Sequence, residues 1–144
     1  MQAKPLSNQN GFSLIEVLIA LVIFSLGMLA VVSLQISSMN ANASSRRQTD
    51  ATALVAERME RLLALPYDHA DLVDTDADGA AGLGHIGEDD ADADFQVTSG
   101  IYDIFWNIAE DDLINNTKTI RVIVVYNNRG EQRQVTLQQV KNRV

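Results

Sequence analysis

An uninterrupted apolar segment near the N-terminus constrains this chain more than any other feature. From Phe12 to Leu34 the sequence reads FSLIEVLIALVIFSLGMLAVVSL, and its one charged residue is Glu16. An α-helix rises about 1.5 Å per residue, so a helical segment of this length spans roughly 34 Å, enough to cross the hydrocarbon core of a membrane. The sequence therefore predicts a transmembrane helix at 12–34.

Two general explanations of this segment are incomplete. A secretory signal peptide could be cleaved at Ala41-Asn42-Ala43, but the apolar run is too long for such a peptide and contains a carboxylate. A signal anchor explains the length of the helix. It does not explain Glu16, because an ionised side chain in lipid costs about 3 kcal/mol or more. Intramembrane carboxylates generally have a function.

A third interpretation explains both features. The hexapeptide Gly11-Phe12-Ser13-Leu14-Ile15-Glu16, after a short polar segment, resembles the processing site of type IV prepilins and pseudopilins. The resemblance implies that 1–11 is a leader peptide, that prepilin peptidase cuts after Gly11 and methylates the new N-terminal Phe12, and that Glu16 is the assembly residue. It also implies further partners: other major and minor pilins and an assembly platform in the inner membrane.

The processing step has a physical rationale. Cleavage would create an α-amine at Phe12, and such amines have a reference pKa near 8, so the group would be cationic at neutral pH. Glu16 could then pair with the Phe12 amine of a neighbouring subunit, which makes both buried charges tolerable inside the assembly. The resemblance places the protein in the inner membrane as a single-pass protein with a periplasmic C-terminal domain, and later in the filament.

An amphipathic helical half is predicted at 35–65. Apolar residues there recur at spacings of three and four, and Glu57 and Arg61 are four apart in the favourable order. Pro66 ends this helix because it lacks an N–H group. Gly27 is the one candidate helix breaker before it, so we expect no sharp kink. The apolar stripe consists of Ala51, Leu54, Val55, Met59, Leu62 and Leu63.

An acidic, Asp-rich loop is predicted at 66–94. Fourteen of the nineteen acidic residues lie between Leu62 and Thr117, where there is no Lys or Arg. This charge repels phosphate backbones, so we expect no nucleic-acid partner. It favours cation binding. The chain has no cysteine, which excludes a disulfide framework and a thiolate nucleophile.

Half of a calcium-binding motif lies in this loop. Asp74, Asp76 and Asp78, followed by Gly79, form the pattern D-x-D-x-D-G, in which alternate carboxylates converge on a hard cation. The twelfth position is His85 where an EF-hand has Glu. Calcium is therefore a candidate cofactor, and a solvated loop without a core of its own is the alternative. Residues that could complete the ligand shell are Glu88, Asp89 and Asp90.

Other candidate sites have simpler explanations. His69 and His85 could bind a transition metal, but histidines in such a loop are more often exposed. Asp111-Asp112 fits a turn between two strands better than a catalytic pair, so we expect no enzyme activity. Tyr102 and Trp106 are expected in the sheet core. Arg46 and Arg47 could contact lipid headgroups or neighbouring subunits, or lie on a solvated helix face.

The remaining segment, 95–144, predicts an antiparallel sheet. Phe95-Gln96-Val97-Thr98, the alternating run from Tyr102 to Ile108 and the alternating run from Ile120 to Tyr126 are the expected strands. Asn127 to Gly130 predicts a hairpin turn, and Val135 and Leu137 face inward from the return strand. The predicted fold is α+β and pilin-like: a long N-terminal helix packed on three or four antiparallel strands.

Within that family, the chain resembles the PilV-type minor pilins most. The resemblance is in Glu57-Arg58-Met59-Glu60 near the helix end and in the strand from Tyr102 to Trp106. It implies a minor pilin of a type IV pilus. Minor pseudopilins of type II secretion share these loose patterns and are the first alternative. A signal-anchored calcium-binding or adhesive domain is another, and a DNA-uptake pilin is disfavoured by the acidic middle.

Overall fold

The computed structural model describes residues 11–87 and 93–143. The chain divides into two compact units, Met1–Asn42 and Ala43–Val144. We call them the N-terminal and the C-terminal unit. The leader prediction for 1–10 and the candidate ligands Glu88, Asp89 and Asp90 lie outside the described residues.

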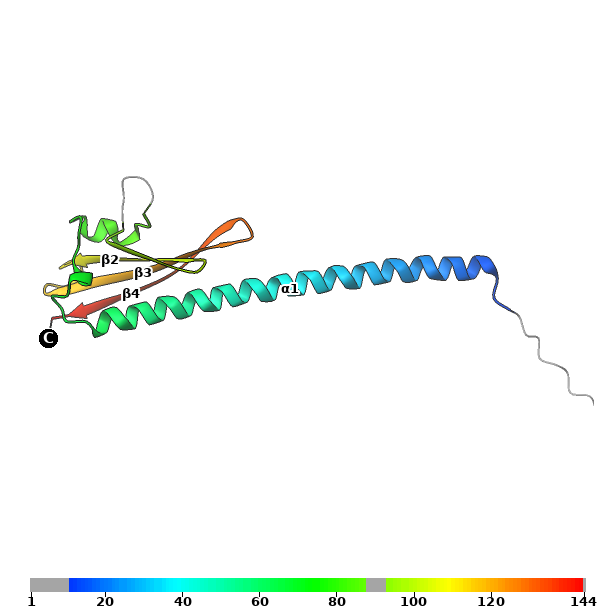
Figure 1. Cartoon of the computed structure of the whole chain (residues 1–144), viewed down its shortest axis with the longest axis horizontal. Helices are drawn as coiled ribbons and strands as arrows, with labels where there is room; N and C mark the ends of the chain where they lie inside the picture. The colour runs from blue at the N-terminus through cyan, green and yellow to red at the C-terminus, as the bar shows by residue number, and fades with distance from the viewer. Residues whose placement is uncertain (1–10, 88–92, 144) are drawn as a thin grey trace, which may run out of the picture. The chain divides into compact units, whose positions relative to one another are not determined.

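One helix, α1, extends over Leu14–Ala64 (Figure 1). Ser13 caps its N-terminus: the Ser13 Oγ accepts a hydrogen bond from the Ile15 N–H at 3.3 Å, and the Ser13 carbonyl accepts one from the Glu16 N–H at 3.0 Å. The helix ends two residues before Pro66, as expected from the missing N–H of proline. No break occurs at Gly27.

In the N-terminal unit, α1 is apolar on all sides. Its large apolar side chains between Phe12 and Met39 have exposed fractions of 49% to 83%. A helix that is apolar all round belongs in a membrane or in the core of a larger assembly. This part of α1 is long and apolar enough to cross a membrane.

In the C-terminal unit, α1 buries the predicted stripe. Ala51, Val55, Met59 and Leu62 are buried, and Leu54 and Leu63 pack against them partly buried. On the opposite side of the helix, the Arg61 guanidinium lies 3.1 Å from the Glu57 carboxylate, as predicted for an i, i+4 pair. Both features of the predicted amphipathic half are confirmed.

The sheet has four antiparallel strands in the order β1-β2-β3-β4. Their bounds are β1 Phe95–Ser99, β2 Tyr102–Glu110, β3 Thr117–Asn128 and β4 Glu131–Asn142. Arg129 and Gly130 have φ values of 61° and 87°, so a two-residue turn with positive φ joins β3 to β4. The predicted hairpin is confirmed, and so is the α+β pilin-like fold.

One face of the sheet packs on α1. In the register of β2 and β3, Ile104 lies opposite Val124, and Trp106 lies opposite Val122. These side chains form one core cluster with the helix stripe, and Val135 and Leu137 of β4 join it partly buried. Burial of this apolar surface is the main source of stability of the C-terminal unit.

The acidic segment packs on the sheet, with Leu72 in the core cluster shared with α1 and η2 on the other face. It contains two short 3-10 helices, η1 (Ala70–Leu72) and η2 (Gly79–Gly84), and η2 packs on β2 and β3 (Figure 1). Leu72 and Leu83 are buried. The expectation that this loop lacks a core is therefore wrong, because its two leucines are buried while its carboxylates lie nearer the surface.

Candidate functional sites

The predicted processing and assembly residues lie at the exposed start of α1. Gly11 and Phe12 precede the helix, and Glu16 is in its first turn. All three are exposed, Phe12 with 83% of its surface. A carboxylate in the first turn is favoured by the helix dipole. Phe12 and Glu16 line one shallow hollow together with Val17, Ala20, Leu21 and Phe24.

Among the residues that the structure describes, nothing requires glycine at position 11. A Cβ atom at this position would meet no heavy atom within 4 Å, and Gly11 does not have a positive φ. Packing and backbone conformation among the described residues therefore both permit a side chain here. A requirement for glycine would have to come from another protein that recognises this segment.

Arg47, in the α1 part of the C-terminal unit, contacts the β3–β4 hairpin of the same unit. Its Nη1 atom lies 3.3 Å from the Asn128 Oδ1 atom, and the Asn128 side chain donates to the Ser44 Oγ atom at 2.7 Å. These bonds tie the β3–β4 hairpin to α1. Arg46 is exposed, so a contact of Arg46 with lipid or with another subunit stays a prediction.

The aspartates of the D-x-D-x-D-G motif accept backbone hydrogen bonds that form turns. The Asp74 Oδ2 atom accepts a hydrogen bond from the Gly79 N–H at 3.0 Å, and the Asp76 Oδ1 atom accepts one from the Asp78 N–H at 3.2 Å. Gly79 has a φ of 60°, which glycine adopts without strain. The second Asp74 oxygen, Oδ1, is buried without a hydrogen-bond partner in the part of the chain that the structure describes.

The three predicted calcium ligands fall into two groups that share Asp76. Ligand atoms of Asp74, Asp76 and Asp94 lie within 4.8 Å of one another, and so do those of Asp76, Asp78 and His85. The first group offers only carboxylate oxygens, the ligands that Ca²⁺ prefers. The second includes an imidazole nitrogen, which is typical of transition-metal sites.

Asp94 is a functional candidate that sequence reasoning missed. Its Oδ1 atom accepts a hydrogen bond from the Thr75 Oγ1 atom at 2.8 Å, and its Oδ2 atom accepts one from the Ile108 N–H at 2.7 Å. Asp94 thereby joins the acidic loop to β2. Its one sequence signal is its position directly before a predicted strand, which does not distinguish it from the other aspartates of the segment.

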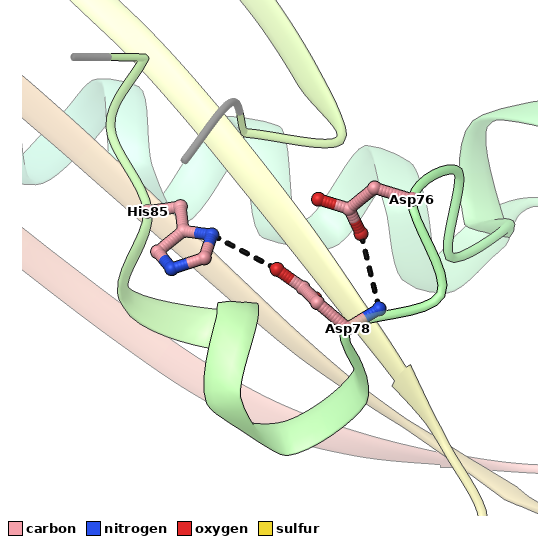
Figure 2. Close-up of side chains that lie close together, drawn as sticks. All are labelled: Asp76, Asp78 and His85. Carbon is pink, nitrogen blue, oxygen red and sulfur yellow. Dashed lines mark hydrogen bonds and ion pairs between the residues drawn. The ribbon is translucent and has the colours of Figure 1, made fainter. Parts of the chain in front are cut away.

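Figure 2 shows the second group of ligands. The His85 Nδ1 atom lies 2.9 Å from the Asp78 Oδ2 atom, and the Asp76 carboxylate lies on the other side of Asp78. Burial and the negative charge of Asp76 raise the pKa of Asp78, and the nearby His85 opposes this rise. His69 lies apart from this group, where its Nδ1 atom accepts a hydrogen bond from the Asp71 N–H at 3.1 Å.

Two of the simpler explanations are confirmed, the turn at Asp111 and the core position of Trp106. Asp111, with a φ of 53°, lies in the turn between β2 and β3, and its carboxylate accepts the Asn116 N–H. Trp106 is buried in the sheet core and stacks on Phe95 with a centroid distance of 5.1 Å. The Arg58 guanidinium covers the Trp106 ring at 4.6 Å, a cation–π contact.

Comparison with known proteins adds one finding. Residues 6–32 match the model of the prokaryotic N-terminal methylation motif. No curated protein and no solved structure is detectably similar to the chain. The matched residues include Gly11, Phe12 and Glu16. The first part of this chain therefore carries the methylation motif of type IV pilin-like and pseudopilin proteins.

Proposed function

We propose that this protein is a minor pilin, a structural and non-catalytic subunit of a type IV pilus. The observation that carries the proposal is the methylation motif at 6–32, which coincides with the start of a helix that is apolar on all sides. The α+β fold of the C-terminal unit, with α1 packed on a four-stranded antiparallel sheet, is compatible with this role.

The proposed maturation uses residues 11 and 12. Prepilin peptidase cuts after Gly11 and methylates the Phe12 amine. The exposure of both residues supports access by an enzyme. The absence of packing around Gly11 among the described residues agrees with recognition by another protein as the reason for glycine. Cleavage on this side of the apolar segment leaves the membrane helix attached to the mature protein.

The proposed docking step pairs two charges. The Glu16 carboxylate lies exposed on an apolar helix, an arrangement that is costly in lipid unless an opposite charge is supplied. The cationic amine of Phe12 on a neighbouring subunit supplies it. The partners in this step are other major and minor pilins and the assembly platform in the inner membrane, from which the subunit enters the filament.

Intact-mass spectrometry of the mature protein, with fragmentation of the N-terminus, tests the maturation. We expect a chain that begins at Phe12 and carries one added methyl group. A chain that begins at Met1 would contradict processing and favour a signal-anchored domain. A chain that begins at Ser44 would indicate a secreted protein, and either result would remove the filament proposal.

A minor pseudopilin of type II secretion is the second candidate, because the methylation motif is common to both machines. Deletion of the gene in a host with both machines separates them. We expect loss of surface pili with secretion of exoproteins unchanged. Loss of secretion with pili retained would favour the pseudopilin.

Calcium binding stays a prediction, with Asp74, Asp76 and Asp78 as the sequence-based ligands. Its structural support is the convergence of Asp74 and Asp76 with Asp94 and the buried Asp74 Oδ1 atom, which has no hydrogen-bond partner among the described residues. Calorimetric titration of the full chain in detergent with Ca²⁺ tests this prediction. Absence of both binding heat and thermal stabilisation would exclude it.

A further inference from the structure

A mixed nitrogen and oxygen ligand set lies beside η2. Asp76, Asp78 and His85 each contribute one potential ligand atom, and these three atoms lie within 4.8 Å of one another (Figure 2). The closest pair, His85 Nδ1 and Asp78 Oδ2, is 2.9 Å apart. Two ligands of a tetrahedral zinc ion are about 3.3 Å apart when each bond is 2.0–2.1 Å long. Small side-chain rotations therefore suffice to close this set around an ion.

The imidazole nitrogen that faces this group has unused bonding capacity. Despite its short contact with Asp78, the His85 Nδ1 atom is buried without a hydrogen-bond partner among residues 11–87 and 93–143. A buried polar atom without a hydrogen bond costs free energy. Coordination of a metal ion by this nitrogen would recover that cost, and the calcium motif does not explain the nitrogen.

The fold reserves space for the Asp78 carboxylate. A Cβ atom at Gly82 would lie 1.8 Å from the Asp78 Oδ1 atom, so only glycine leaves this carboxylate in place. The reserved space holds the Asp78 Oδ2 atom 2.9 Å from the His85 Nδ1 atom.

The ligands are held on the sheet. The Asn107 side chain, buried in β2, donates hydrogen bonds to the Leu83 carbonyl at 3.3 Å and to the His85 carbonyl at 2.8 Å. These bonds fix the C-terminal end of η2 and the backbone of His85. A ligand set fixed by packing and hydrogen bonds binds a metal more tightly than one on an unrestrained loop.

We propose that Asp76, Asp78 and His85 form a binding site for a first-row transition-metal ion, with Zn²⁺ as the ion of choice and water in the remaining coordination position. Zinc accepts imidazole nitrogen and carboxylate oxygen together, whereas Ca²⁺ prefers oxygen ligands. The bound ion would link the Asp76–Asp78 turn to His85 and so stabilise the acidic segment on the sheet. The site does not depend on filament assembly.

Calorimetric titration of the metal-free full chain in detergent with Zn²⁺ tests the proposal. We expect one Zn²⁺ per chain and a higher melting temperature of the C-terminal unit. His85→Gln should lower the affinity at least tenfold. His69→Gln is the matched control, since it removes the other histidine of the chain, and it should leave the affinity unchanged. Zinc binding should also persist in the presence of equimolar Ca²⁺.

An NMR experiment on the wild-type chain gives a readout that needs no variant. The ¹H–¹⁵N spectra of the two imidazole rings should show one ring, that of His85, shifting with added Zn²⁺. Absence of zinc binding, zinc affinity unchanged by His85→Gln, or a shift confined to His69 would each overturn the proposal. Displacement of zinc by equimolar Ca²⁺ would also overturn it, because it would identify an oxygen site.

Discussion

The phenol of Tyr102 joins the start of β2 to α1. The Tyr102 hydroxyl donates a hydrogen bond to the Arg47 carbonyl at 3.3 Å, and its ring lies 5.6 Å from that of Tyr126. Burial, followed by the negative charge of Asp50, raises the pKa of Tyr102 above its ordinary value of 10.0. The folded C-terminal unit therefore disfavours the phenolate more strongly than the unfolded chain does.

This shift predicts the behaviour of the protein in alkali. The contribution of Tyr102 to stability is fully present below pH 10.0, the ordinary pKa, and is lost as the pH rises from there through the higher folded-state pKa. Tyr102→Phe should remove this alkaline component, and at neutral pH it should cost about 0.5–1.5 kcal/mol of unfolding free energy for the lost hydrogen bond. Denaturant unfolding at neutral and alkaline pH measures both effects.

Tyr126→Phe is the control for this experiment, because Tyr126 lies beside Tyr102 in the same core cluster. An alkaline loss of stability should persist in this variant, because it retains the Tyr102 phenol. If Tyr102→Phe retains the full alkaline loss, the assignment of the titrating group to Tyr102 is wrong.

The contacts of two lysines, Lys118 and Lys141, could not be predicted from the sequence. Lys118 is almost completely buried, with 4% of its side chain exposed, and its Nζ atom donates to the Leu72 carbonyl at 2.6 Å while it pairs with Glu110 at 2.9 Å. Lys141 similarly donates to the Leu65 carbonyl at 2.6 Å, near the end of α1. From the sequence alone, a lysine in a strand is expected to be exposed to solvent. Their roles depend on carbonyl groups that are 46 and 76 residues away in the chain, and no local pattern encodes such pairs.

At the scale of elements, the sequence predicted those features that depend on residue spacing and on local turn or helix-breaking residues. The helix stripe from Ala51 to Leu62, the end of the helix before Pro66 and the β3–β4 hairpin follow from spacing, from proline and from the Arg129-Gly130 turn. The acidic segment could not be predicted in this way. Its apolar residues are isolated among aspartates. Leu72 is buried in the core cluster that the sheet forms with α1, whereas Ile86 packs partly buried on the other face of the sheet, formed by Phe105, Ile123 and Val125.

The two neighbouring residues Leu72 and Val73 test whether the acidic segment is part of the core that the sheet forms with α1. Leu72 has an exposed fraction of 0% and Val73 one of 41%, although both are aliphatic residues in the same acidic segment. Leu72→Ala should cost about 2–5 kcal/mol of unfolding free energy, because it leaves a cavity in the core. Val73→Ala should change the unfolding free energy by no more than about 0.5 kcal/mol.

Urea denaturation of the full chain in detergent, followed by the fluorescence of Trp106, measures both variants. Trp106 reports on the same region, because its Nε1 atom donates a hydrogen bond to the Asp71 carbonyl at 3.1 Å. Equal, small effects of the two substitutions would mean that the segment is solvated, as the sequence alone suggested, and that η1 is not part of the core.

At the scale of the whole molecule, we expect the N-terminal unit to carry filament assembly and the C-terminal unit to fold around its own core. The N-terminal unit presents an apolar helix with one charged residue between Leu14 and Asn42, Glu16, whereas the C-terminal unit has a core of its own. The stability of the C-terminal unit and the assembly of the filament should therefore respond to different substitutions. The methylation motif could be recognised from the sequence because it is a short, local pattern, which needs no fold to be recognised.

Glu16→Gln tests this division, because it removes the charge of Glu16 and keeps its size. We expect processing at Phe12 to continue, the unfolding free energy of the C-terminal unit to stay within about 0.5 kcal/mol of the wild type, and entry into filaments to fall at least tenfold, since the Phe12 amine loses its counter-charge. The amount of subunit in sheared filaments relative to the membrane fraction measures the last effect. Glu57→Gln is the matched control: it also neutralises a glutamate of α1, but one in an exposed ion pair with Arg61, and should leave incorporation unchanged. Wild-type incorporation of Glu16→Gln would show that docking uses the apolar surface of the helix alone, and an equal loss in Glu57→Gln would show a general requirement for negative charge on α1.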